Sequence, residues 1–288
     1  MVVSRSVKAS QTTLGFTVML TLAAAGTAHA KGDEPLRFLV CQPGGPTLED
    51  QEQTVIRDFY RFISKKLGLG ESGVVGEYHN KWDACAQAMK TGPSLLMLSL
   101  DMFLRQRKAL ALEPVVQVNF DGSTTSHFYL MVAAEGPKTM RELRGKTISG
   151  THVDDVDFLA RVVFESKLGP KDELKLKKEK LGLRAVRRVI RGKSAAVLLD
   201  AAQYKAIVGT PFEKKLRLLY TSPALPNPPV AISSKKVSAD LRARIAKIML
   251  DMASDPTGQT LTKTFGIQGF ARPDPGVFDK LSRVLDGK

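Results

Sequence analysis

Short apolar runs alternate along the chain with segments in which apolar residues recur every three to four positions. Four runs predict strands in the first part of the chain, at 36–41, 74–79, 95–100 and 114–120. The run at 95–100 is apolar almost throughout, which is typical of a strand covered on both faces. Between the runs, the helical period predicts helices at 48–67, 82–90 and 102–110.

The same alternation continues in the second part of the chain. Strands are predicted at 127–134, 146–149, 183–189, 193–198, 215–220 and 230–233. Helices are predicted at 140–145, 154–167, 200–208, 238–254, 257–264 and 278–285, with Ser238 as the N-cap of the long amphipathic one. Repeated strand–helix units predict mostly parallel sheets with helices on both faces.

Two segments interrupt this order and predict crossovers between lobes. Residues 121–126 are small and polar, and residues 222–229 contain four prolines, which fit neither a helix nor a central strand. A chain that leaves a domain and returns to it forms a two-lobed clamp with a hinge. We therefore expect an α/β fold of two doubly wound mixed sheets. The first, discontinuous lobe comprises residues 31–124 plus 226–288, and the second lobe comprises residues 125–225.

The first thirty residues have the pattern of a secretory signal peptide. Arg5 and Lys8 form a basic start, residues 12–27 carry no charge, and Ala28-His29-Ala30 matches an A-x-A cleavage pattern. An uncleaved anchor is the alternative, although the apolar core is short for the ~20 residues of a spanning helix. We predict cleavage, a periplasmic protein and a mature chain that starts near Lys31.

The net charge of the chain narrows the range of ligands and partners that we expect. The 288 residues include 43 Lys and Arg against 29 Asp and Glu, a net charge of +14, which becomes +12 without Arg5 and Lys8. Export excludes cytosolic nucleic acid as the natural partner, so the basic surplus favours anionic solutes or acidic surfaces. Eleven of the basic residues fall in 165–193, against four acids, a density that also fits a solvated helix face.

The two cysteines exclude a disulfide framework and a four-cysteine zinc site. An oxidising compartment permits a disulfide between Cys41 and Cys85, and two separate buried thiols are the alternative.

Several segments resemble the phosphate, phosphite and phosphonate-binding family of periplasmic proteins that serve ABC importers. Asp121-Gly-Ser followed by Tyr129 and Val132 resembles the family's outgoing crossover, and Glu142-Leu-Arg-Gly-Lys146 resembles its D/E-L-x-G-K element. Residues 220–230 resemble the return crossover, and 256–269 resemble the terminal helix and G-x-x-G-F turn. The resemblance implies the type II periplasmic binding protein fold and a small ligand, phosphate- or phosphonate-like, bound by hinge closure.

One segment departs from that family. The Ser/Thr-rich stretch that cradles the anion in the family is replaced by Thr151-His-Val-Asp-Asp155, with Asp157 close behind. Backbone N–H groups at a helix start attract an oxyanion. Carboxylates at the same place would repel that anion, fill its position themselves or simply cap the helix. The identity of the ligand is therefore left open by the sequence.

Ligands of open α/β sheets bind beyond the carboxyl ends of the strands. Residues just past a predicted strand end are accordingly the candidate ligand-binding residues: Gln42, Gly44, Gly45, Tyr78, His79, Ser99, His127, Tyr129, Thr151, His152 and Asp200.

Other function classes stay open as alternatives. His79, His127 and His152 with Asp154 or Asp155 could form a metal-binding clamp, although no H-x-x-H or H-E-x-x-H spacing supports it. A periplasmic sensor or adaptor that signals to a membrane protein is the runner-up to transport. No nucleophile elbow, Walker loop or dinucleotide-binding glycine motif is present, so we expect no enzyme, catalytic residue, metal or cofactor. We expect a monomer whose partners are a small anionic ligand and a membrane permease.

Overall fold

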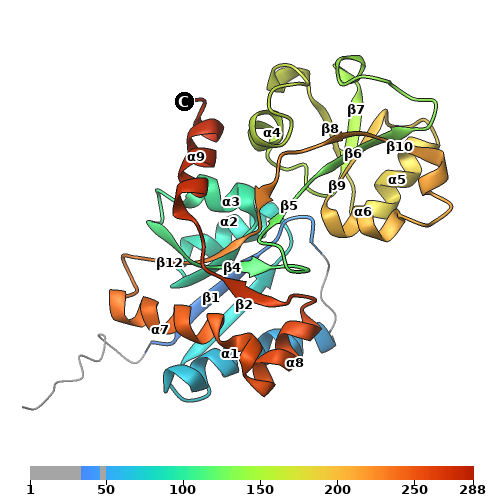
Figure 1. Cartoon of the computed structure of the whole chain (residues 1–288). Helices are drawn as coiled ribbons and strands as arrows, with labels where there is room; N and C mark the ends of the chain where they lie inside the picture. Colours follow the sequence, from blue (N-terminus) through green and yellow to red (C-terminus); the bar gives the residue numbers. More distant parts are fainter. Residues whose placement is uncertain (1–33, 46–49) are drawn as a thin grey trace, which may run out of the picture. The chain divides into compact units, whose positions relative to one another are not determined.

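The computed structural model describes residues 34–45 and 50–288, and the predicted signal peptide lies outside the described residues. Residues Pro35–Lys288 form one compact unit. In this unit the strands form a six-stranded sheet, a five-stranded sheet and a two-stranded pair (Figure 1). We call the elements around the six-stranded sheet lobe 1 and those around the five-stranded sheet lobe 2. None of the described helices is both long and apolar enough to span a bilayer.

The sheet of lobe 1 has the order β13-β4-β12-β3-β1-β2. Its strands are β1 (Leu36–Cys41), β2 (Val74–His79), β3 (Leu95–Leu98), β4 (Leu112–Asn119), β12 (Pro229–Ser233) and β13 (Gly269–Ala271). The first three strands are parallel, whereas β12 runs antiparallel to β3 and β4. The carboxyl ends of β1, β2 and β3 therefore meet at one edge.

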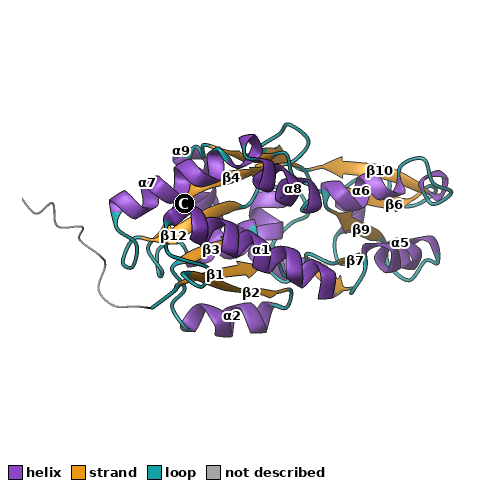
Figure 2. Ribbon diagram, turned by 90° about the horizontal axis from the view of Figure 1, so that it is seen from below, coloured by secondary structure: helices purple, strands orange, loops and turns teal. Residues whose placement is uncertain are grey.

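Helices cover both faces of this sheet because successive strand residues point to opposite sides. Phe38 and Val40 pack with residues of α1 (Asp50–Leu67), α7 (Ala239–Leu250) and α8 (Pro256–Thr264). Leu39 and Cys41 belong to the cluster on the other face, with residues of α2 (Trp82–Lys90), α3 (Leu100–Gln106) and α9 (Pro275–Asp286). Figure 2 shows the helices on either side of the strands.

The sheet of lobe 2 has the order β10-β6-β9-β7-β8. Its strands are β6 (Tyr129–Ala133), β7 (Thr147–Gly150), β8 (Lys175–Lys178), β9 (Ala196–Leu199) and β10 (Leu216–Thr221). Its helices are α4 (Val156–Phe158), which continues as a π-helix (Leu159–Val163), α5 (Gly182–Ile190) and α6 (Ala201–Ile207). Short 3₁₀ turns occur at Arg141–Leu143, Lys171–Glu173, Glu213–Lys215 and Met252–Ser254. Because β7 and β9 are parallel, their carboxyl ends also lie together.

The two crossovers lie side by side. In one, β5 (Thr125–Ser126) pairs antiparallel with β11 (Leu225–Pro226) in the other. Asn227 joins them further, since its amide nitrogen donates to the carbonyl oxygens of Val118 at 3.1 Å and Ser123 at 2.9 Å. The side chain is 1% exposed, so water does not compete for these bonds. The crossover region is thus a small sheet with a buried asparagine.

The predicted fold class is confirmed, and one element type was wrong. Residues 183–189 form part of helix α5 and not a strand. Ala185, Val186 and Val189 are the buried positions, a spacing that a helix places on one face. Four strands were not predicted: β8 is a lysine-rich edge strand, β13 has only three residues, and β5 and β11 are two-residue strands in the crossovers. None of them carries the apolar signal of a long covered strand.

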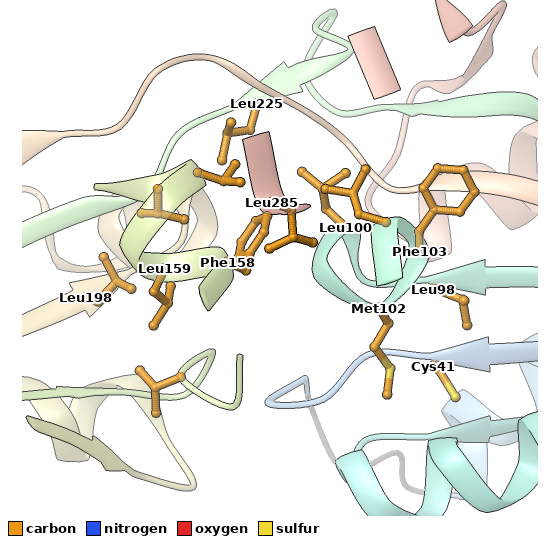
Figure 3. Close-up of a cluster of buried hydrophobic side chains, with 14 of the residues drawn as sticks. Cys41, Leu98, Leu100, Met102, Phe103, Phe158, Leu159, Leu198, Leu225 and Leu285 are labelled. Carbon is orange, nitrogen blue, oxygen red and sulfur yellow. The ribbon is translucent and has the colours of Figure 1, made fainter. Parts of the chain in front are cut away.

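A single apolar cluster includes residues of both lobes (Figure 3). Helix α9 joins them: Phe278 meets Phe103 of α3 edge to face at 5.2 Å, and Leu285 belongs to the same cluster as Phe158 of α4. Arg161 of the π-helix donates to the carbonyl oxygen of Leu285 at 2.7 Å. Packing against α9 therefore helps to hold the lobes in the arrangement described here.

We predict that Phe278→Ala lowers the free energy of unfolding by about 3–5 kcal/mol, because it leaves a cavity at a side chain that is 0% exposed. Urea denaturation followed by circular dichroism measures the change. The neighbouring Val277→Ala is the matched control, since Val277 is 38% exposed and the expected change is within about 0.5 kcal/mol. Equal effects of the two substitutions would contradict the packing role of α9.

Candidate functional site: the contact between the lobes at the strand ends

The loop after β1 touches the loop after β7. A Cβ atom placed on Gly44 would lie 2.4 Å from the Thr151 carbonyl oxygen and 3.0 Å from Nδ1 of His152. Gly44 also has a φ of +85°, a backbone conformation that favours glycine. Any side chain at this position would push the lobes apart. Gly44 therefore permits the close approach that brings the polar groups of both lobes together.

His152 connects the lobes through both ring nitrogens. Nδ1 lies 3.0 Å from the Pro43 carbonyl oxygen in lobe 1, and Nε2 lies 2.9 Å from a carboxylate oxygen of Asp200 in lobe 2. Both partners are acceptors, so only the protonated imidazolium satisfies both bonds. Burial opposes protonation, but the hydrogen bond and attraction of Asp200, with smaller contributions from Asp101 and Pro43, raise the pKa of His152 above its ordinary value.

Asp200 is fixed by the start of helix α6. Its carboxylate caps the helix by accepting from the Gln203 N–H at 2.8 Å. Burial works against ionisation, but the bonds from His152 and from the helix N–H groups lower the pKa of Asp200 below its ordinary value. The side chain of Gln203 donates to Oγ1 of Thr151 at 2.8 Å, while its own Oε1 is buried without a partner within the described chain. The start of α6 thus holds Asp200, the carboxylate partner of His152, in place.

A second connection between the lobes is the ion pair of Arg105 with Asp155. Arg105 of α3 meets both carboxylate oxygens, through Nε and, at 2.5 Å, through Nη2. Asp155 is 5% exposed and caps α4 by accepting from the Phe158 N–H at 2.9 Å. Asp157 lies 3.3 Å from the same guanidinium nitrogen. A carboxylate of the chain itself therefore occupies the helix start where the resembling family holds an anion.

Asp101 adds a buried acid beside these groups. Its carboxylate accepts from the Ser99 hydroxyl at 2.5 Å and from the Met102 N–H at 2.8 Å. Burial raises the pKa of Asp101, and the nearby charge of Asp155 raises it further, against the opposing effect of the two bonds. A carboxyl with a raised pKa retains its proton to higher pH, and in that form it donates a hydrogen bond.

The structure brings together some of the residues predicted from sequence and separates others. Gly44, Thr151, His152 and Asp200 form the interlobe contact, and Gln42 and Gly45 belong to the same loop as Gly44. Ser99 reaches it only through Asp101.

The remaining predicted residues have other partners. His79 pairs with Glu77 at 3.0 Å. His127 is bonded to the Ser222 carbonyl oxygen at 2.8 Å. Tyr129 stacks on Tyr204 with ring centroids 4.0 Å apart.

The metal-binding alternative is not supported. The described residues contain no group of three or more histidine, cysteine or acidic side chains placed to hold a metal. His79, His127 and His152 are each engaged by a separate hydrogen-bond partner. The two cysteines, both buried, are free thiols in this structure.

Arg105 and Gln203 belong to this contact, and sequence reasoning missed both. Arg105 lies in the middle of a predicted helix, with no pattern to single it out, and Gln203 lies within the helix that Asp200 begins. The run of aspartates after Thr151 was the one available signal, because acids at a helix start need a cation or N–H groups to stabilise them.

We predict that the stabilisation due to His152 fades as the pH rises. A group whose pKa is raised by folding contributes fully below its ordinary pKa of about 6.5 and loses its contribution as the pH passes its raised value. The melting temperature of His152→Gln should therefore lie furthest below that of the unmodified protein near pH 6 and approach it by pH 9.

Val277→Ala is the control, because Val277 has no titratable side chain and its difference from the unmodified protein should not depend on pH over this range. Asp200 loses its contribution only in acid, because folding lowers its pKa, and Asp101 is present in both proteins. A difference for His152→Gln that grows with pH would contradict the bridging imidazolium.

Comparison with known proteins identifies the family of the chain. Residues 46–277 match the family described as ABC transporter, phosphonate, periplasmic substrate-binding protein. A search of curated proteins gave no match. Among solved structures, XAC2383 from Xanthomonas citri bound to ATP is 12% identical, with a TM-score of 0.70 over 88% of this chain and 98% of that one.

Two further structures have the same fold. A binding protein component of an ABC phosphonate transporter from Pseudomonas aeruginosa is 9% identical, with a TM-score of 0.65 over 88% of this chain and 86% of its own. PhnD1 from Prochlorococcus marinus in complex with methylphosphonate is 10% identical, with a TM-score of 0.64 over 88% of this chain and 98% of its own. With two lobes, two crossovers and a family match over most of its length, the chain belongs to the periplasmic substrate-binding proteins of phosphonate ABC transporters.

Proposed function

We propose that this protein binds a small phosphorus oxyanion of the phosphonate or phosphate type between its two lobes. As a member of its family it is a substrate-binding component of an ABC importer, and it delivers the solute to a membrane permease. It does so as a monomer and without catalysis. Residues 31–124 with 226–288 move against residues 125–225 about the paired crossovers, after a signal peptide of residues 1–30 has been removed.

The position of Asp155 is the observation that carries the proposal. Its carboxylate accepts from a helix N–H at 2.9 Å and from two nitrogens of Arg105 in the opposite lobe. Phosphonate oxygens accept from the same kinds of donor, and arginine pairs with carboxylate and phosphate groups in the same bidentate geometry. Asp155 thus acts as a built-in substitute for the ligand, and an incoming anion takes over Arg105.

The protonated His152 supplies the second positive charge. It lies at the point where Gly44 of lobe 1 meets the Thr151 loop, with its pKa raised by Asp200. An oxyanion that replaces Asp155 between Arg105 and the start of α4 would contact both lobes. The charge of His152, whose two N–H groups are already bonded, would attract it. A ligand that binds the closed arrangement more tightly than the open one shifts the population toward closure. Closure would then be the form recognised by the permease.

The structural neighbours support a phosphorus ligand. One was solved with methylphosphonate and another with ATP, and both present phosphorus oxyanions to a two-lobed protein of this fold. The acids around the present site distinguish it from a simple anion cradle. Asp101 with its raised pKa and the capped Asp200 would discriminate against anions that offer no hydrogen-bond donor or acceptor to them.

Calorimetric titration of residues 31–288 with methylphosphonate, phosphite, phosphate and sulfate tests the proposal. We expect one-site binding of a phosphorus oxyanion and a loss of at least tenfold in affinity, about 1.4 kcal/mol, in Arg105→Gln. Lys108→Gln is the matched control, because Lys108 follows α3 with a side chain that is 78% exposed and pairs only with Asp286 among the described residues. Lys108→Gln should bind the phosphorus oxyanion with the same affinity as the unmodified protein.

Asp155→Asn tests directly whether the Asp155 carboxylate takes the place of the ligand. Asparagine retains an oxygen to cap α4 but removes the charge that competes for Arg105. The affinity for the phosphorus oxyanion should therefore rise roughly tenfold, about 1.4 kcal/mol. Weaker binding by Asp155→Asn, or no binding of any oxyanion by the unmodified protein, would overturn the proposal.

A further inference from the structure

Lobe 1 contains an apolar cavity of about 300 Å³. It lies between one face of the six-stranded sheet and the helices α1 and α8. Its walls include Phe38 and Val118 from the sheet, Val55 and Phe59 from α1, and Phe265 and Ile267 beyond the end of α8. Almost all of its lining side chains are aliphatic or aromatic. The described side chains of lobe 1 therefore leave space on this face.

Aromatic contacts connect the walls of the cavity to one another. Phe59 meets Phe265 edge to face at 5.6 Å and Phe38 at 5.7 Å, so the three rings support one another around the space. A cavity of about 150 Å³ with apolar walls is large enough to bind benzene. The cavity of lobe 1 has twice that volume, and it reaches the lower end of the size range of ligand pockets, roughly 300–1,000 Å³. Its size and lining fit an alkyl or aryl group.

The cavity adjoins the interlobe site. Gln42 and Tyr78 are among its lining residues. A Cβ atom placed on Gly45 would lie 2.9 Å from the Tyr78 hydroxyl and 3.2 Å from the Cβ of Gln42, whereas the preceding Gly44 touches Thr151 and His152. Two consecutive glycines therefore separate the apolar cavity from the polar contact between the lobes.

We propose that the physiological ligand is amphipathic: a phosphorus oxyanion that carries an alkyl or aryl substituent. The oxyanion binds between the lobes, and the substituent enters the cavity along Gln42 and Tyr78. This inference rests on the proposed function, since it adds a second subsite to the same ligand site. The cavity makes this protein selective for substituted phosphonates over the bare inorganic anion.

A series of alkylphosphonates, from methyl through butyl to hexyl, together with phenylphosphonate, tests the inference by calorimetry. Burial of a methylene group in an apolar site tightens binding roughly fourfold. Affinity should therefore rise with each added methylene until the cavity is full, and the heat-capacity change of binding should become more negative along the series. Phenylphosphonate should bind more tightly than methylphosphonate.

Two variants fill the cavity from different walls, Val55→Trp and Ile267→Trp. Each should abolish the advantage of hexylphosphonate while methylphosphonate binds as before. Arg57→Trp is the matched control, because Arg57 is an exposed residue of the same helix α1 and does not line the cavity. Thermal melting checks that each variant is folded, and the series on the unmodified protein decides the question if a variant does not fold.

The outcomes separate this inference from the proposed function. Binding of methylphosphonate with no gain for hexyl- or phenylphosphonate would overturn the cavity subsite and leave the proposed function standing. Retention of the hexyl advantage in both tryptophan variants would also overturn it. If no phosphonate of any length binds, the proposed function fails, and the amphipathic ligand fails with it.

Discussion

The ion pair of Arg105 with Asp155 connects the two lobes, and the rest of the site is arranged around this contact. The Asp155 side chain is 2% exposed, so removal of the guanidinium would leave a buried carboxylate without its cation. Asp155 also caps α4, so the same carboxylate fixes the start of a helix and the distance between the lobes. Under the proposed function, an oxyanion that reaches Arg105 competes with Asp155, and this would make the arrangement of the lobes sensitive to anions.

His152 forms a second connection between the lobes, and the strength of this connection depends on pH. Its bonds to Pro43 and Asp200 require a doubly protonated ring, whereas the hydrogen bond to Asp155 raises the already high pKa of Arg105 and keeps that side chain charged. Under the proposed function, the contact between the lobes would combine one connection that responds to anions with one that responds to protons. Helix α9 and its apolar contacts supply the part of the interface that responds to neither.

Much of the fold could be predicted from the sequence, because covered strands and amphipathic helices have strong periodic signals. Positions 36–41 form β1, and the predicted strand at 95–100 forms β3 as far as Leu98, where Ser99 begins the turn into α3. The proline-rich 222–229 became part of a crossover. The prediction was wrong at 183–189, where Val186 and Val189 alternate with arginines in a way that a short strand and a helix share. Strand β8 escaped prediction because an edge strand with three lysines has no buried face to signal it.

The site was only partly predictable. Gly44, Thr151, His152 and Asp200 follow strand ends, and topology alone brings such positions together. Arg105 could not be found in this way, because its role depends on a partner 50 residues away in the other lobe. The cavity was equally invisible, since Phe38, Phe59 and Phe265 each have the pattern of ordinary core residues. Unfilled space between side chains produces no pattern in the sequence.

A crystal structure of the mature protein with methylphosphonate is the most direct test of the central claim, that Asp155 stands in for the ligand's oxyanion. We predict that the phosphorus group lies between the lobes within hydrogen-bond distance of Arg105 and beside the charged ring of His152, with the Asp155 carboxylate displaced from the guanidinium. An intact Arg105–Asp155 pair with the anion bound elsewhere would contradict it.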